Sequence, residues 1–71
     1  MKKYQLNAVF EDDTVVTFGE FDYEYEIDAI NDCYFLLKTD DRFDFDYSFS
    51  DEDGITYGGK HFSHIEALEV Q

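Results

Sequence analysis

At the start of the chain, hydrophobic and polar residues alternate in the manner of a β-hairpin. Three acidic residues at positions 11–13 interrupt the alternation, and residues 14–18 are rich in β-branched and aromatic side chains. A period of two is typical of a strand with one buried face, so this stretch predicts two antiparallel strands joined by an acidic turn. The apolar positions of the first strand, residues 3–10, are Tyr4, Leu6, Ala8 and Phe10.

The segment that follows fits two periodicities. Residues 20–28 alternate apolar and acidic side chains, as in a half-buried strand. A helical stripe overlaps it at spacings of three and four residues, and Asp22 could cap a single helix over this region. Strand propensity favours the first half and helical spacing the second, so we predict a strand to about Ile27 and a helix from about Asp28 to Lys38. The residues of the helical stripe are Tyr23, Ile27, Ile30, Tyr34 and Leu37.

The C-terminal part reads as further strands. Residues 43–49 alternate aromatic side chains with Asp44, Asp46 and Ser48, which predicts a strand with one aromatic and one acidic face. The sequence 51–54, ending in Asp-Gly, predicts a hairpin turn, since Gly accepts the positive φ of tight turns. Residues 55–57 begin the return strand, and Gly58-Gly59 predicts a bulge or a further turn. Residues 61–70 favour a strand, with a short helix opened by a Ser63/Glu66 capping box as the alternative.

Together these elements predict an α+β fold for residues 1–71 as a single domain. It consists of a small antiparallel β-sheet of about four to five strands, with one helix packed on one face. Fourteen aromatic residues, eight Phe and six Tyr, supply the large apolar surfaces that a disordered acidic tail lacks. A sheet face with only one short helix over it leaves a homodimer open.

The charge of the chain narrows the classes of partner. Eighteen acidic residues face five Lys and Arg, a net charge of −13, and sixteen of the acids lie between Glu11 and Asp53. Nucleic acid and anionic membranes repel such a chain, so neither is expected as a direct partner. A small domain needs a charge of only about 2–8 for solubility, and the excess costs stability through self-repulsion. Basic proteins and metal cations remain as partners of such a chain, and of these we expect a basic protein.

The predicted strands would arrange the acids in rows. Alternate residues on one strand face repeat at about 6.6–6.8 Å, while phosphates on one DNA strand rise about 3.4 Å each along the axis and lie about twice as far apart through space. A carboxylate row can therefore imitate a run of phosphates in a groove of Lys and Arg. We expect Tyr23 or Tyr25 to add stacking on Arg. The acids of the two rows are Asp22, Glu24, Glu26 and Asp28 in the longer one, and Asp44 and Asp46 in the shorter one.

In length, acidity, aromatic content and the Phe21–Glu26 pattern, the chain resembles a class of small acidic proteins of phages and mobile elements that mimic DNA. The class includes anti-restriction proteins, uracil-DNA glycosylase inhibitors and anti-CRISPR proteins. The resemblance implies an inhibitor that blocks the nucleic-acid site of a nucleic-acid-binding protein or complex in the bacterial cytoplasm. Three alternatives stay open: an immunity-type or regulatory protein that binds a basic toxin or host factor, an accessory phage protein, and a merely solvated acidic face.

Catalytic, metal and export functions find little support in the sequence. No nucleophile with a base and no phosphate loop has recognisable spacing, so we expect no enzyme and no cofactor. The acids at 51–53 fail the calcium-loop pattern, and His61, His64 and Cys33 lack a fourth zinc ligand. Cys33, the one cysteine, indicates a reducing compartment and is expected to be buried. Lys2 and Lys3 are not followed by the apolar stretch of a signal peptide.

Overall fold

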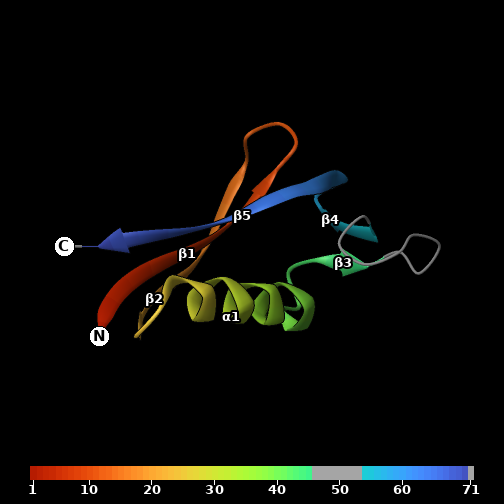
Figure 1. The fold of residues 1–71 in the computed structure, drawn as a ribbon. Coiled ribbons are helices and arrows are strands. Elements are labelled where there is room, and N and C mark those ends of the chain that lie inside the picture. Colours follow the sequence, from red (N-terminus) through yellow and green to blue (C-terminus); the bar gives the residue numbers. More distant parts are fainter. Residues whose placement is uncertain (46–53, 71) are drawn as a thin grey trace.

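The computed structural model describes residues 1–45 and 54–70. In this part of the chain, one helix lies on a five-stranded antiparallel sheet with the strand order β2-β1-β5-β4-β3 (Figure 1). The predicted α+β fold is therefore confirmed. The first strand begins beside the point where the last strand ends, at one end of the sheet. The elements are β1 (Lys2–Phe10), β2 (Val15–Tyr23), α1 (Glu26–Thr39), β3 (Asp44–Phe45), β4 (Ile55–Tyr57) and β5 (Lys60–Val70).

The predicted N-terminal hairpin is present. Strands β1 and β2 pair antiparallel, and the turn between them closes with a hydrogen bond from Phe10 N to Thr14 O, 2.8 Å long. Asp13 takes the left-handed φ of 68° that Asp tolerates better than most residues. The register shifts at Phe18, and Gly19 beside it has φ 135°, as expected at a β-bulge.

The C-terminal segment is a strand, so the alternative of a short helix at Ser63 is wrong. Strand β5 runs for eleven residues and pairs with both β1 and β4. Its hairpin with β4 turns at Gly58 and Gly59, whose φ values of 59° and 82° are those of the two-residue turn that matches strand twist. This confirms the return strand at residues 55–57 and the turn predicted at the glycines.

The boundary between β2 and α1 differs from the prediction. Strand β2 ends at Tyr23 and the helix begins at Glu26, so the strand predicted to reach Ile27 is about four residues too long. The Tyr23 ring packs 6.3 Å from that of Tyr4, and its hydroxyl donates a hydrogen bond to Asp32 of α1. These contacts require the chain to turn back over the sheet immediately after Tyr23.

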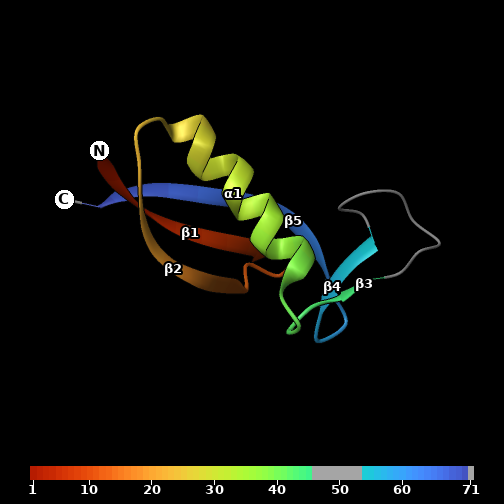
Figure 2. The ribbon, with the colours of Figure 1, turned by 90° about the horizontal axis from the view of Figure 1, so that it is seen from below.

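Helix α1 crosses one face of the sheet (Figure 2). Its fully buried residues are Ala29, Cys33 and Leu37, at a spacing of four, while Ile30 and Tyr34 are half-buried beside them. Small residues at the first two positions let the helix approach β1, where the Cys33 thiol lies 3.7 Å from the carbonyl oxygen of Asn7. Ile27, a member of the predicted helical stripe, is instead 58% exposed.

A second part of the core is aromatic and lies at the C-terminal end of α1. The ring of Phe10 contacts those of Phe43, Tyr57 and Phe62, with centroids 5.6, 5.6 and 6.1 Å away. Phe43 thus packs against the core, whereas Phe45, on the same face of the predicted strand, is 41% exposed. Of the strand predicted at residues 43–49, Asp44 and Phe45 are in β3, while Asp46 and the turn at 51–53 lie outside the described residues.

Candidate acidic binding surface

The five alternate acids of residues 20–28, called here the acidic segment, do not form one row. Asp22 and Glu20 of β2 stand opposite Lys3 and Gln5 of β1, on the sheet face away from the helix, because the intervening Tyr4 packs under α1. Glu24 lies in the bend, and the remaining two acids are in the first turn of α1. The predicted straight carboxylate row is therefore wrong. The acids instead wrap around the corner where β2 passes into α1. The members of the acidic segment are Glu20, Asp22, Glu24, Glu26 and Asp28, all exposed.

Part of this arrangement has a local structural reason. The first helical position is preceded by Tyr25, which has extended φ and ψ and makes no side-chain cap, although its carbonyl oxygen accepts the amide of Asp28 at 3.1 Å. Free amides at a helix N-terminus carry partial positive charge, so carboxylates in the first turn stabilise the helix. Glu26 and Asp28 serve this purpose. Glu20, Asp22 and Glu24 lie before the helix and have no such role.

Basic side chains pair with acids elsewhere in the described chain. The ion pairs are Lys2–Glu69 at 3.5 Å, Arg42–Asp40 at 2.7 Å, Lys60–Asp12 at 2.8 Å and, when the histidine is protonated, His64–Glu66 at 3.6 Å. Within residues 1–45 and 54–70, no cation forms an ion pair with any acid of the acidic segment. These carboxylates are therefore available to cations of a partner.

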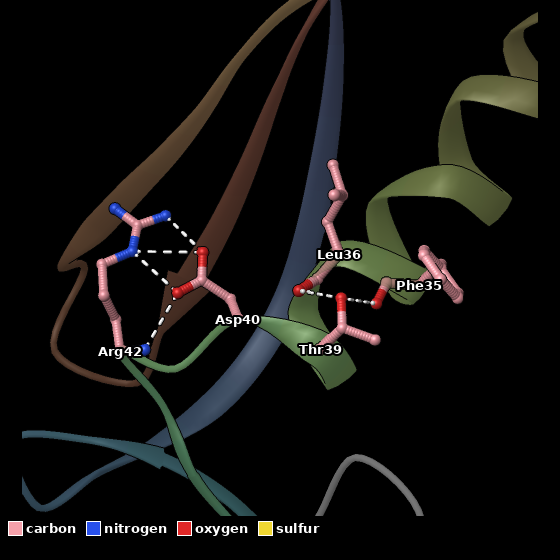
Figure 3. Close-up of polar contacts among 5 residues, drawn as sticks. All are labelled: Phe35, Leu36, Thr39, Asp40 and Arg42. Atoms are coloured by element: carbon pink, nitrogen blue, oxygen red, sulfur yellow. Dashed lines mark hydrogen bonds and ion pairs between the residues drawn. The ribbon is translucent and has the colours of Figure 1, made fainter.

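The pairing of Arg42 is local and structural. Its guanidinium and backbone amide donate to the Asp40 carboxylate directly after α1, where Thr39 also donates to the carbonyl oxygen of Phe35 (Figure 3). The Arg42 hydrogen bonds lower the pKa of Asp40. The guanidinium also lies 5.6 Å from the ring centroids of Phe18 and Phe43. Arg42 thus closes the aromatic end of the core.

Asp12 is held in the same way in the β1–β2 turn. Its carboxylate accepts Lys60 Nζ, as well as the hydroxyl of Thr14 at 2.6 Å and the Thr14 amide at 3.1 Å. These hydrogen bonds, that of Lys60 first, lower the pKa of Asp12 to about 2. The turn therefore neutralises one of its three acids.

The two tyrosines proposed for stacking have different environments. Tyr23 is half-buried, and burial together with its hydrogen bond to Asp32 raises the pKa of its phenol. It belongs to the contact between helix and sheet, so of the two tyrosines it is the less accessible to an Arg of a partner. Tyr25 is 61% exposed at the start of α1, and it remains available.

The shorter acidic row lies apart from the acidic segment. Asp44 is exposed on β3, beyond the C-terminal end of α1, whereas the acidic segment surrounds the N-terminal end (Figure 1). Asp46 is outside the described residues. The structure thus does not bring Asp44 together with the acidic segment on one surface.

Two apolar residues of α1 lie on the surface, where the sequence pattern did not place them. Ile27 and Phe35 are 58% and 62% exposed. Eight residues separate them, so they share one side of the helix, opposite the buried Ala29, Cys33 and Leu37. The signal was present, because Phe35 never fitted the predicted core stripe. Hydrophobicity alone could not assign it to the surface.

Features associated with other chemistry are accounted for structurally. Burial raises the pKa of the Cys33 thiol to about 11, which leaves it protonated and unreactive at neutral pH. His64 contacts Ser63 and Glu66, and no group of three metal-ligating side chains occurs among the described residues.

No helix in the described ranges is long and apolar enough to cross a lipid bilayer. No protein-family model, curated protein or solved structure matches the chain.

Proposed function

We propose that this protein is a small acidic inhibitor that occupies the nucleic-acid site of a basic protein, in the manner of the DNA-mimicking proteins of phages and mobile elements. The observation that supports the proposal is the acidic segment. Its five carboxylates are exposed, and no described cation pairs with them. A surface under no selection for binding usually mixes charges of both signs, because adjacent like charges are destabilising.

The physical basis is electrostatic. A groove that holds nucleic acid presents Lys and Arg to phosphates, and charge complementarity raises the rate of association with any similarly charged surface. Carboxylates that wrap around a corner of the domain project in several directions, so they can meet cations on both walls of a groove. Blocking then requires only that the domain fill the groove.

The broken row also favours a second candidate. The acids do not repeat at the interval of alternate strand residues. Their arrangement can therefore be explained without imitation of the spacing of phosphates. An immunity-type or regulatory protein that binds a basic toxin or host factor would use the same surface. It would inhibit its partner without competing with nucleic acid.

Affinity capture followed by competition tests the proposal. The purified protein is immobilised, a bacterial lysate is passed over it at about 0.15 M NaCl, and bound proteins are eluted at about 1 M, where the Debye length falls to about 3 Å. Each eluted protein is purified, and its nucleic-acid affinity is measured with and without the inhibitor. Stoichiometric loss of nucleic-acid binding supports mimicry. Capture without displacement favours the immunity-type function, and the absence of any salt-eluted partner contradicts both.

A further inference from the structure

The outer side of α1 carries an apolar stripe that no described residue covers. Ile27, Asn31 and Phe35 follow one another at a spacing of four, so they lie in one line along the helix. At 1.5 Å per residue, the line from Ile27 to Phe35 is about 12 Å long. Both apolar members are more than half exposed. Two large side chains so placed form a stripe long enough to contact one turn or more of a partner helix.

An acidic row runs beside this stripe. Asp28 and Asp32 are also four residues apart, and their line on the helix adjoins that of the stripe. Like charges at this spacing destabilise a helix. Asp32 accepts a hydrogen bond from Tyr23, and no described cation pairs with either carboxylate. Glu24, just before the helix, extends the negative charge towards its N-terminal end.

We propose that this face of α1, defined by Ile27, Phe35, Asp28 and Asp32, is the docking site for a basic amphipathic helix of the partner. Its arginines or lysines would face the acidic row, and its apolar side chains would cover Ile27 and Phe35. The inference rests on the proposed function and deepens it, since it assigns an apolar anchor to an interface otherwise described by charge alone.

Charge selects this occupant over others. A second copy of the chain also carries a net charge of −13, so docking two such faces would set Asp28 and Asp32 against like charges. An anionic membrane is repelled for the same reason. A basic amphipathic helix gains from both the acidic row and the apolar stripe. Complementary charge accelerates encounter, while a buried apolar anchor slows dissociation.

Two synthetic peptides test the inference. They have equal length and equal arginine content. One carries leucines at a spacing of three and four residues, and the other carries alanines in their place. Alanine has the higher helix propensity, so a preference for the leucine peptide cannot come from its helicity. Binding is measured by calorimetry at about 0.05 M and about 0.5 M NaCl, and the contact surface is mapped by amide chemical-shift changes.

We expect the leucine peptide to bind at least about tenfold more tightly, which is the effect of one buried anchor. I27S and F35S should abolish the preference, and the shift changes should centre on α1. V15S and L68S serve as matched controls, because both residues are exposed and their register positions lie on the sheet face away from the helix. These variants should keep the preference.

The outcomes separate this inference from the proposed function. Equal, strongly salt-dependent binding of the two peptides would overturn the apolar docking site and leave the acidic inhibitor intact. A preference lost in V15S or L68S, but kept in I27S and F35S, would move the site to the sheet. If neither peptide binds at low salt, the docking site and the electrostatic basis of the proposed function both fail.

Discussion

Phe10 and Phe35 provide a matched pair of substitutions, since they are the same residue type in opposite environments. Phe10 is 1% exposed and its ring touches three other rings, whereas Phe35 is 62% exposed on the outer side of α1. Truncation of each to alanine therefore removes the same atoms from the core and from the surface. The pair tests the core and the exposed helix face in one experiment.

The magnitude follows from the size of the domain. At about 0.05–0.15 kcal/mol per residue, a chain of 71 residues has a free energy of unfolding of roughly 4–11 kcal/mol. A buried Phe→Ala change costs about 3–5 kcal/mol. Since 1 kcal/mol shifts the melting temperature of a domain this small by about 4–8 °C, F10A should melt roughly 10–40 °C lower. F35A should change the free energy of unfolding by less than about 0.5 kcal/mol.

Urea denaturation followed by far-UV circular dichroism measures both free energies, and thermal melts give the second readout. If F35A is destabilised as much as F10A, Phe35 is packed in solution, and the apolar docking face does not exist. If F10A unfolds like the wild type, the aromatic cluster around Phe10 is not the core. Either result would contradict the assignment of Phe10 to the core and Phe35 to the surface.

Two further predictions concern charge. The melting temperature should rise between low salt and about 0.15 M NaCl, because salt screens the repulsion among the acids. At that salt the Debye length of about 8 Å is shorter than the 12.2 Å radius of gyration. A flat or falling melting temperature would indicate that the acids are paired. Asp12 has a pKa lowered from 3.8 to about 2 in the fold, so it should stabilise the fold above pH 4. This contribution should be lost as the pH falls towards 2, because the Asp12 carboxyl is protonated at a higher pH in the unfolded chain than in the folded one. The stability difference between wild type and D12N, from urea titrations at several pH values, should shrink over that interval; a constant difference would mean that the Lys60 contact is absent in solution.

Local patterns were sufficient to predict most of the sheet. The alternation in β1, the acidic turn after Phe10 and the paired glycines at 58–59 each specify a strand or a turn through nearby residues alone. The antiparallel sheet with one helix then follows from the need to bury one face. These elements agree with the sequence because no distant contact competes with the local preference.

The corner between β2 and α1 could not be predicted in this way. From Phe21 to Ile27 the residues satisfy both a strand and a helix pattern, so the boundary depends on contacts between segments far apart in sequence. Tyr23 packs on Tyr4 and hydrogen-bonds Asp32, which places the turn after Tyr23. This position of the turn splits the predicted row of acids and leaves Ile27 exposed.

The candidate site could be predicted from the sequence in composition but not in shape. The excess of acids in residues 20–28 is visible in the sequence, and the structure leaves those acids without a described cation. Their division between a sheet face and a helix end depends on the fold. The exposed Phe35 could be recognised only once the buried side of α1 was known, because small residues, Ala29 and Cys33, occupy it.

In the proposed function, the position of the acids around the β2–α1 corner, rather than total charge, drives binding to a basic partner. Glu24 and Asp41 allow a matched test, since both are exposed, lie just outside opposite ends of α1 and form no ion pair with a described residue. E24K and D41K change the net charge equally. The measurement is the dissociation constant of each folded variant with the partner captured at about 0.15 M NaCl. We expect at least about a tenfold loss of affinity for E24K and less than about a twofold change for D41K. Equal losses would mean that total charge alone governs binding.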